Sequence, residues 1–284
     1  MRCVLTVAGL GTRLLPVTKE TPKEMLPIYS KSKKGNLILK PVLQVIYESL
    51  YDYKIKEFCF VTGRTKRAVR DHFQLDYELM NLLKKQNKNE LADTLNDFFS
   101  KVKKSHISFI YQPKPIGFGD AISRSKKFAS KDKYFLLHAG DDIVISKNND
   151  HLRRLEKNLQ KYDADIAILL EKVRDPSKYG VVDGPYLEKG VLQIKSMVEK
   201  PKNPPSKNAI IAIYIFKPVI FKYLTEAKKI EKNPEMQLAR AFNIALEHDS
   251  KMIGVFLKKG EKRIDVGTPE TYSKVLSSIR NIIN

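Results

Sequence analysis

The clearest chemical signal in this chain is a glycine-rich turn that directly follows an apolar run. The run Cys3–Val7 leads into a turn in which Gly9 and Gly11 expose backbone N–H groups. Such groups, together with the fixed fork of donors on Arg13, can hold the phosphates of a nucleotide. The third glycine of the dinucleotide fingerprint and the Gly-Lys-Ser/Thr of a P-loop are both absent. The turn therefore predicts a phosphate cradle of another type, with Lys23 as a second cation nearby.

Two aspartates that each end a strand-like run are candidates for holding a divalent cation. They are Asp141, directly after Gly140, and Asp265, two residues after Arg263. Two carboxylates on one rim of a sheet can hold one Mg²⁺, which keeps its other positions for water and phosphate oxygens. The ion would neutralise charge on an α-phosphate and fix its geometry. The structural alternatives are a turn or helix cap for Asp141 and, for Asp265, a turn or an ion pair with Arg263. The adjacent Asp142 is expected to point elsewhere.

Two further segments could bind the remaining parts of a nucleotide and of a phosphorylated sugar. Gln112 can offer a donor and an acceptor to a pyrimidine edge, and Gly117 lets backbone lie against a flat ring. Lys200 is a point charge suited to a phosphate monoester, and Glu199 can accept hydrogen bonds from sugar hydroxyls. A capped turn and an exposed charged turn are the structural alternatives for these segments. No Ser-His-Asp or Cys-His set is apparent, so we expect no covalent intermediate.

Short apolar, β-branched runs alternate with helical patterns up to Leu170. The alternation predicts a mostly parallel sheet with helices on both faces. Ligands of such sheets lie beyond the carboxyl ends of the strands, where the Gly9 turn, Gln112 and Asp141 all fall. The predicted strands are Cys3–Val7, Phe58–Thr62, Ile107–Tyr111, Tyr134–Leu137 and Ile166–Leu170. The predicted helices are Pro41–Tyr51, Lys66–Leu83, Leu91–Phe99, Asp120–Phe128 and Asp150–Lys161.

Two local patterns add detail to this first part. One apolar helix face is predicted by leucines that recur at helical spacing, namely Leu75, Leu79, Leu82 and Leu83. The polar, basic stretch Ser30–Gly35 is expected to be a surface loop.

After Leu170 the apolar runs become shorter, which predicts a smaller lobe with a second, mixed sheet. We expect one domain over residues 1–284, divided at about residue 145 into a nucleotide-binding part (about 1–145) and a second part (about 146–284). The predicted strands of the second part are Gly180–Asp183, Val191–Val198, Asn208–Phe216 and Met252–Leu257. The predicted helices are Lys217–Ala227, Glu235–His248 and Pro269–Ile283.

The chain is strongly basic, with a net charge of +20 from 52 basic and 32 acidic residues. The lysine clusters are scattered and lack interleaved aromatic residues, so we expect solvated surfaces and no nucleic-acid partner. A positive field would still concentrate anionic substrates. No run approaches the ~20 apolar residues that cross a bilayer, and no signal segment precedes Cys3, so we expect a cytoplasmic protein without a membrane partner. Cys3 and Cys59 are expected to be buried thiols.

Taken together, these motifs resemble the bacterial and archaeal type of UTP–glucose-1-phosphate uridylyltransferase, a branch of the sugar-phosphate nucleotidyltransferases. The resemblance runs from Val7 almost to the C-terminus. Pro22–Pro27 and Asp71–Phe73 are the stretches most typical of this branch. The other matching segments are Ala8–Arg13, Val61–Arg64, Gly117–Ala121, Gly140–Asp142, Tyr179–Val182, Val198–Pro201, Glu235–Leu238 and Asp265–Gly267.

The resemblance implies a Rossmann-like, doubly wound mixed sheet with a smaller sugar-binding lobe. It also implies Mg²⁺ as cofactor, UTP and glucose 1-phosphate as substrates, and a homo-oligomer, either a dimer or a tetramer. In-line attack on the α-phosphorus would give UDP-glucose and pyrophosphate. The implied metal ligands are Asp141 and Asp265, and Arg13 and Lys23 would face the pyrophosphate. The implied uridine site is Ala8, Gly9, Gly11, Glu24, Gln112 and Gly117, and the implied sugar site is Gly180, Glu199 and, for its phosphate, Lys200.

Three departures and three alternatives accompany this hypothesis. Ser30–Lys40 is longer than the usual link, His138–Ala139 replaces an aliphatic pair, and Lys232–Pro234 replaces a Gly-Asp near the expected sugar contacts. The main alternative is a thymidylyltransferase, or an enzyme that accepts both UTP and dTTP, because Gln112 and Glu24 can read an edge that uracil and thymine share. A binding module without catalysis and a nucleic-acid binder are the other two; the first predicts a missing carboxylate.

Overall fold

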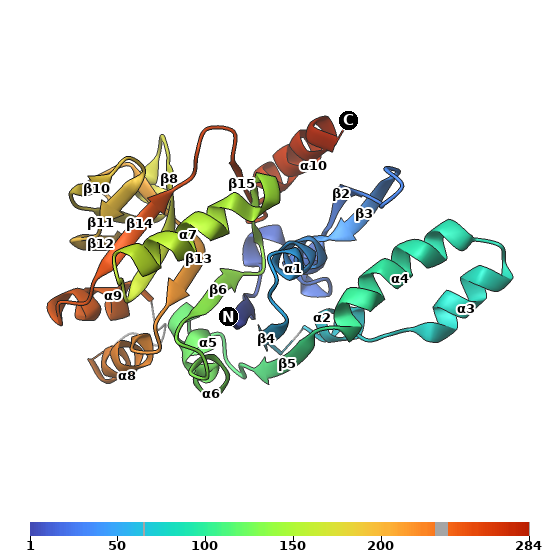
Figure 1. Cartoon of the computed structure of the whole chain (residues 1–284), viewed down its shortest axis with the longest axis horizontal. Helices are drawn as coiled ribbons and strands as arrows, with labels where there is room; N and C mark the ends of the chain where they lie inside the picture. Colours follow the sequence, from blue (N-terminus) through green and yellow to red (C-terminus); the bar gives the residue numbers. More distant parts are fainter. Residues whose placement is uncertain (65, 231–237, 284) are drawn as a thin grey trace.

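Residues 1–64, 66–230 and 238–283 of the chain are described by a computed structural model, whose main feature is an 11-stranded mixed sheet (Figure 1). Strand β1 (Cys3–Val7) lies inside the sheet and is buried throughout. It pairs in parallel with β4 (Glu57–Thr62) and β6 (Phe135–Ala139), and β4 pairs in parallel with β5 (His106–Tyr111). These strands confirm the parallel arrangement predicted for the first part of the chain.

The second part of the chain extends the same sheet, largely by antiparallel pairing. Strand β13 (Asn208–Phe216) lies antiparallel between β6 and β8 (Ile166–Lys172), and β14 (Met252–Phe256) runs parallel to β8. The short strands expected after Leu170 form a smaller lobe, but the prediction of a second sheet is wrong, because these strands are continuous with the main sheet. The strands of this lobe are β9 (Gly180–Asp183), β10 (Tyr186–Glu188), β11 (Val191–Gln193) and β12 (Ser196–Glu199).

The single strand predicted over Val191–Val198 is two strands, because the chain changes pairing partner within it. Strand β11 pairs with β10 and β14, whereas β12 pairs with β9. At the change, the Ile194 N–H donates to the Met252 carbonyl and the Lys195 N–H donates to the Asp183 carbonyl, each at 2.9 Å. The backbone groups therefore stay hydrogen-bonded across the break.

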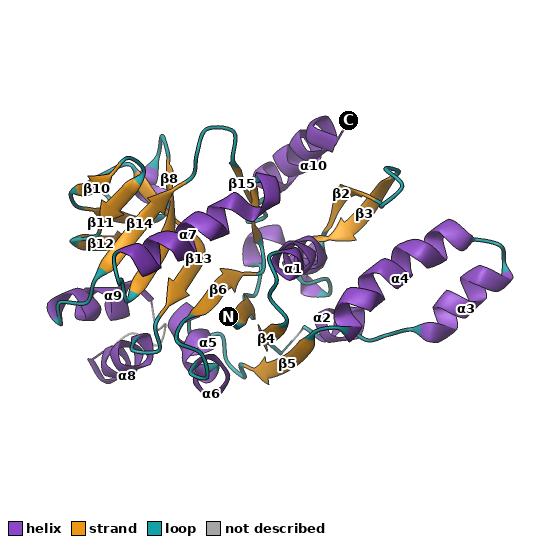
Figure 2. Cartoon of the chain, in the orientation of Figure 1, coloured by secondary structure: helices purple, strands orange, loops and turns teal. Residues whose placement is uncertain are grey.

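Helices cover both faces of the sheet, as the alternating pattern predicts (Figure 2). Along β1, Leu5 and Val7 join one buried apolar cluster while Val4 joins the other, because successive strand side chains point to opposite faces. The helices of the first face are α1 (Val42–Asp52), α4 (Asn89–Lys103), α7 (Asp150–Lys161) and α10 (Pro269–Ile283). The helices of the second face are α5 (Phe118–Arg124), α6 (Lys126–Ala129), α8 (Ile220–Ile230) and α9 (Leu238–Glu247).

The helix predicted over Lys66–Leu83 is wrong, since the chain forms α2 (Arg67–His72) and then α3 (Tyr77–Lys85). The Asp76 carboxylate starts the second helix by accepting from the Leu79 N–H at 2.8 Å. Helix α3 buries none of its residues, and Leu79 and Leu82 are 42% and 50% exposed, so this part of the predicted apolar face does not reach the core; Leu75, which precedes the helix, packs against the core. Helices α3 and α4 instead project together from the body (Figure 1).

The segment Ser30–Lys40 belongs to a hairpin of β2 (Pro27–Lys31) and β3 (Leu37–Pro41), which the sequence does not predict. Only the turn between these strands matches the expected surface loop. An ion pair of Lys33 with Asp97 ties the turn to α4. The Tyr272 hydroxyl of α10 donates to the Pro27 carbonyl at 2.7 Å. The hairpin as a whole therefore contacts both α4 and α10.

A small ladder closes the carboxyl end of the sheet. Strand β7 (Asp142–Ile145) pairs antiparallel with β15 (Lys262–Asp265), which places Asp265 opposite Asp142. Short 3₁₀ turns complete the chain at Thr12–Leu14 (η1), Val17–Lys19 (η2), Lys23–Met25 (η3), Lys147–Asn149 (η4) and Pro176–Lys178 (η5). The thiols of Cys3 and Cys59 are free and buried, as predicted. No helix within the described ranges is long and apolar enough to cross a membrane.

His151 on α7 makes folding stability depend on pH. It is 2% exposed, and within the described residues its Nδ1 has no hydrogen-bond partner. Burial, aided by the nearby His138, lowers the pKa of His151 to about 4. As pH falls from about 6.5 towards 4, His151 is protonated in the unfolded chain but stays neutral in the folded protein, so the free energy of unfolding decreases.

We expect His151→Leu to remove about 2 kcal/mol of the stability loss between pH 7 and pH 5. At pH 7 the variant should be as stable as the original chain, because the orphaned nitrogen is gone. Urea unfolding at both pH values measures the difference. Equal pH dependence in the two proteins would contradict this role for His151.

Candidate active site

A cavity of about 930 Å³ opens where the carboxyl end of the sheet meets the β7–β15 ladder and the smaller lobe. Residues from distant parts of the chain line it because their strands end at the same rim. The predicted site residues among them are Arg13, Asp141, Gly180, Glu199, Lys200 and Asp265. The structure therefore brings together the candidates for phosphate, cation and sugar binding.

The two candidate metal ligands are held side by side by backbone pairing. Asp265 is paired with Asp142 in the ladder, and the Val266 N–H donates to the Asp141 carbonyl at 3.2 Å. A Cβ on Gly267 would lie 2.9 Å from the Asp265 carboxylate, so a residue without a side chain leaves room for it. Burial raises the pKa of the Asp265 carboxyl, and the negative charges of Asp142 and Asp141 raise it further.

The two carboxylates are suited to an open site for a hard divalent cation, in which water and substrate supply the other ligands. Within the described residues, no group of three or more His, Cys, Asp or Glu side chains is placed to hold a metal. Mg²⁺ does not need such a group, because it retains waters and binds through one or two carboxylates plus substrate phosphates. Asp141 and Asp265 border an open cavity that can admit those further ligands.

Arg263 forms an ion pair with Asp142, not with Asp265 as the alternative from the sequence would have it. Its Nε lies 2.8 Å from Asp142 Oδ1 and its terminal nitrogen lies 2.7 Å from Oδ2. The side chains are 11% and 4% exposed, and both residues border the cavity. The expectation that Asp142 points elsewhere fails in one respect, since it still borders the site. Sequence spacing could not reveal the pair because it depends on the register of two short strands.

Charges of alternating sign lead from the cavity into the interior. Lys23 forms an ion pair with Asp141, and a buried ion pair joins Lys66 Nζ to Glu24 Oε2 at 2.8 Å. Burial lowers the pKa of Lys23, but the charges of Asp141 and Glu24 outweigh it, so the net shift is upward. Burial raises the pKa of Glu24, and Lys66 opposes this. Glu24 is 1% exposed and reaches its surroundings through these partners.

The predicted nucleotide cradle lies beside the cavity, at the ends of β1 and β4. Gly11 has φ +67°, and its carbonyl accepts from the Thr18 hydroxyl at 2.8 Å. A Cβ on Gly63 would lie 3.0 Å from the Ala8 carbonyl, so the two turns approach closely. A Cβ on Gly9 would lie 3.7 Å from Lys23 Cε, which places this turn next to the lysine that pairs with Asp141.

Gln112 and Gly117 lie together at the end of β5. The Gln112 amide nitrogen donates to the Gly117 carbonyl at 3.1 Å and to Asp120 Oδ2 at 2.9 Å. Both N–H donors of the amide are therefore engaged within the protein, which leaves its carbonyl oxygen as the group that can meet a ligand. Phe118, next to Gly117, borders the cavity and connects this corner with it.

The predicted sugar residues come together through the β9–β12 ladder. Gly180 is paired with Glu199, and a Cβ on Gly180 would lie 2.9 Å from Glu199 Oε2. Lys200 has φ +43°, an unfavourable value for a residue with a side chain. Its N–H donates to the Tyr179 carbonyl at 3.0 Å, and its Nζ lies 3.5 Å from Glu199 Oε1. The left-handed backbone at Lys200 thus ends β12 directly after Glu199.

Other cavity residues were not predicted from the sequence. Thr268, directly before α10, and Glu270, Thr271 and Lys274 in its first turns line the cavity, and the helical pattern gave no signal of this contact. Leu238 begins α9 and borders the cavity. The rest of the predicted motif Glu235–Leu238, the start of the helix predicted over Glu235–His248 and the departure Lys232–Pro234 lie outside the described residues. His138 is buried and its Nδ1 lies 2.7 Å from the Ala139 carbonyl oxygen.

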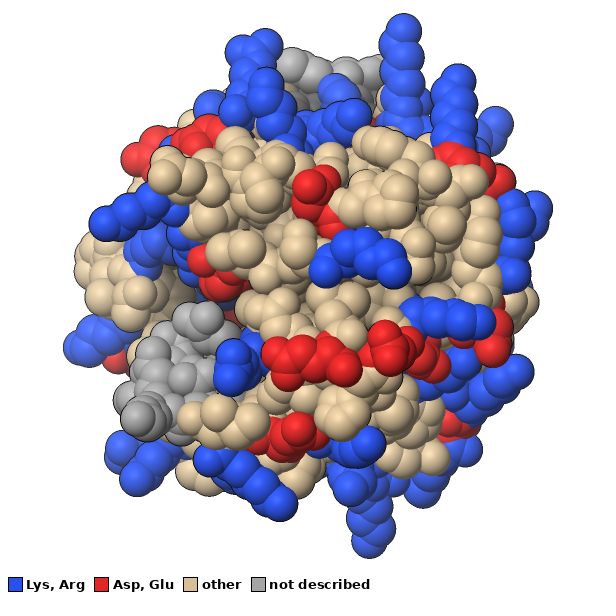
Figure 3. Space-filling view, turned by 90° about the vertical axis from the view of Figure 1, so that its left-hand side faces the viewer, with Lys and Arg blue, Asp and Glu red and all other residues tan. Residues whose placement is uncertain are grey.

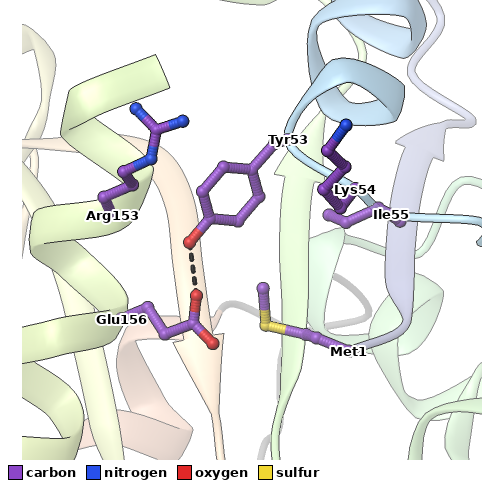
Figure 4. A pocket seen from close by; sticks show the side chains of 6 residues that line it. All are labelled: Met1, Tyr53, Lys54, Ile55, Arg153 and Glu156. Atoms are coloured by element: carbon purple, nitrogen blue, oxygen red, sulfur yellow. Dashed lines mark hydrogen bonds between the residues drawn. The ribbon is translucent and has the colours of Figure 1, made fainter. Parts of the chain in front are cut away.

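A second hollow, of about 380 Å³, lies where β1 and β4 begin, at the opposite end of the strands (Figure 4). Its Glu156 accepts from the hydroxyls of Tyr53 and Tyr134. Because this carboxylate is already satisfied, the hollow offers less chemistry than the larger cavity. The face drawn in Figure 3 shows Lys and Arg side chains spread around its outline with acidic side chains among them. This face fits the predicted scatter of positive charge.

Comparisons with known sequences agree with the geometry. A family model described as nucleotidyl transferase matches residues 2–281. A UTP–glucose-1-phosphate uridylyltransferase of Pseudomonas aeruginosa is 34% identical over 93% of this chain and 90% of its own. A Methanocaldococcus jannaschii protein that carries the same name provisionally is 38% identical over 94% of this chain and 88% of its own.

Solved structures confirm the predicted fold. Apo UDP-glucose pyrophosphorylase superposes with a TM-score of 0.84 and 33% identity, covering 99% of this chain and 98% of that one. A UDP-glucose pyrophosphorylase complexed with UDP-glucose gives a TM-score of 0.81 and 32% identity over the same 99% and 98%. The resemblance recognised from the motifs therefore extends over nearly the whole fold.

We expect Lys66→Met to destabilise the protein by about 3–5 kcal/mol, because it leaves the Glu24 carboxylate buried without a counter-charge. The double variant Lys66→Met, Glu24→Gln should recover much of this loss. Urea unfolding of both measures the effect. The control is Arg67→Met, at the residue that follows Lys66 in the chain, which breaks an exposed ion pair with Asp71. It should change the unfolding midpoint little. A small effect of Lys66→Met would show that Glu24 is not held by this pair.

Proposed function

Because the chain belongs to the nucleotidyl transferase family, we propose that it transfers the uridylyl group of UTP to glucose 1-phosphate, forming UDP-glucose and pyrophosphate. The observation that carries this proposal is the common cavity of Asp141, Asp265, Arg13 and Lys200. Carboxylates for a cation and cations for two phosphate groups are the parts that such a transfer needs. The UDP-glucose complex of a structural relative supports the same substrates.

The reaction would make one phosphorus–oxygen bond and break another. A phosphate oxygen of glucose 1-phosphate attacks the α-phosphorus of UTP, and the bond to the β-phosphate breaks to release pyrophosphate. Arg13 and Lys23 would neutralise the leaving group, while Lys200 would hold the attacking phosphate. Glu199 would accept hydrogen bonds from sugar hydroxyls beside Gly180. These contacts align the two substrates and leave little else for the protein to do.

A divalent cation completes this arrangement. Asp141 and Asp265 would hold Mg²⁺, which supplies charge neutralisation at the α-phosphate when it is bound. Their oxygen donors and the open side of their site support this assignment.

The uridine would lie over Ala8, Gly9 and Gly11, with Gln112 and Gly117 at its base. The free carbonyl oxygen of Gln112 can accept from the N3–H of uracil, which thymine shares. This shared group is the observation behind the second candidate, an enzyme that also uses dTTP. The motif resemblance further leads us to propose a cytoplasmic homo-oligomer, a dimer or tetramer, with its nucleotide-binding part at about 1–145 and its sugar-binding part at about 146–284.

Pyrophosphate release tests the reaction directly. The assay supplies Mg²⁺ and glucose 1-phosphate with UTP, dTTP, ATP, CTP or GTP in parallel. We expect release with UTP well above dTTP, because the structural relatives are UDP-glucose pyrophosphorylases. Comparable rates with UTP and dTTP would favour the second candidate, and no release with any nucleotide would overturn the proposal.

We expect Asp141→Asn to reduce kcat by at least ~10²-fold while leaving the thermal midpoint near that of the original chain. The loss follows from removing one of two carboxylates that would hold the cation. Asp97→Asn, on the surface of α4, is the control and should retain activity. Full activity of Asp141→Asn with unchanged Mg²⁺ dependence would remove Asp141 from the metal site.

A further inference from the structure

The ion pair of Asp142 and Arg263 has no role in the proposed chemistry, yet it is built into the wall of the cavity. The guanidinium binds both carboxylate oxygens, and the two side chains are 4% and 11% exposed. Asp142 directly follows Asp141 in the chain, and Arg263 lies two residues before Asp265. The pair therefore joins β7, which begins directly after Asp141, to β15, which ends at Asp265.

The same pair also reaches beyond the β7–β15 ladder. Asp142 Oδ2 accepts from the Ala212 N–H of β13 at 3.3 Å, which anchors the ladder to the main sheet. The Arg263 guanidinium lies 5.2 Å from the centre of the Tyr179 ring, next to Gly180 of the sugar site. One buried side-chain pair thus contacts the metal strands, the central sheet and the sugar loop.

Resting on the proposed function, we propose that Asp142 and Arg263 are positioning residues. They set the spacing of the Asp141 and Asp265 carboxylates and hold Tyr179 and the adjacent sugar loop against the metal site. A bidentate guanidinium suits this task because its planar fork fixes both distance and angle. A lysine keeps the charge but contacts one oxygen at a time and leaves the orientation of the carboxylate free.

The alternative is that the pair only stabilises the ladder. Replacing both partners by apolar residues separates the two roles, because a buried ion pair can be exchanged for packed apolar side chains without loss of stability. Asp142→Leu with Arg263→Met therefore removes the positioning contacts and leaves a filled interior. If the pair is purely structural, a double variant that is as stable as the original chain should also be as active.

The chain offers a matched control. Arg154 of α7 contacts both oxygens of Glu261, at 3.0 and 2.6 Å, and these side chains are 14% and 8% exposed. This pair also joins separate elements but does not border the cavity. Arg154→Met with Glu261→Leu should keep the original kcat.

For Asp142→Leu with Arg263→Met, we expect a near-native thermal midpoint but a kcat lower by about 10²-fold, the scale of a small misplacement at a reacting centre. The Mg²⁺ concentration for half-maximal rate should rise, as should the KM for glucose 1-phosphate. As a readout apart from turnover, Mn²⁺ binding in the presence of UDP-glucose, followed by paramagnetic resonance, should weaken at least about 10-fold, in line with the loss of groups that orient metal ligands.

Arg263→Lys provides a second variant that preserves the charge. Positioning predicts a folded protein with reduced kcat and weaker Mn²⁺ binding. Native kcat and Mn²⁺ binding in either the lysine variant or the apolar double variant would overturn the inference. The proposed function fails separately, if the original chain releases no pyrophosphate with any nucleotide, so the two outcomes remain distinguishable.

Discussion

The site depends on bringing several carboxylates to one rim of the sheet and holding them close together. Backbone pairing of β7 with β15 enforces the proximity of Asp141, Asp142 and Asp265. Neighbouring negative charges repel each other and oppose folding unless positively charged side chains lie close to them. Lys23 pairs with Asp141 on one side and Arg263 with Asp142 on the other. The arrangement of basic residues around the cavity follows from this electrostatic requirement as much as from the anionic substrates that we propose.

The same requirement extends into the interior. Glu24 offsets the charge of Lys23 and is in turn paired with Lys66, so the row ends on a lysine that is almost fully buried. Removing any member leaves its neighbour uncompensated in a medium of low polarity. The phosphate cradle, the cation site and the turn before α2 are therefore parts of one electrostatic unit. Their sequence motifs are far apart, but they must be built together.

Local pattern was enough to predict most of the fold. The bounds of β1, β9, β13, α7 and α10 match their predicted ranges, because each has a clear apolar period or a buried run. Arg13 and Asp141 could be expected to share a cavity, since turns after parallel strands must meet at one rim, whereas the cavity residues around the start of α10 gave no such signal. The break between α2 and α3 was missed because the Asp76 cap overrides an otherwise helical pattern. Strands β7 and β15 are four residues each, and neither their pairing nor the partner of Arg263 is encoded locally.

The internal bonds of Gln112 have a consequence for which bases could be tolerated. Because Gly117 and Asp120 accept from both donors of its amide, the side chain is held with its oxygen as the remaining group, and turning the amide over would break both hydrogen bonds. Uracil would present a proton to that oxygen, whereas cytosine carries a lone pair on the same ring nitrogen. Two lone pairs facing each other repel, and no rearrangement within the pocket relieves this. Selection against cytosine would then arise from a mismatch that is fixed in advance by the protein's own hydrogen bonds.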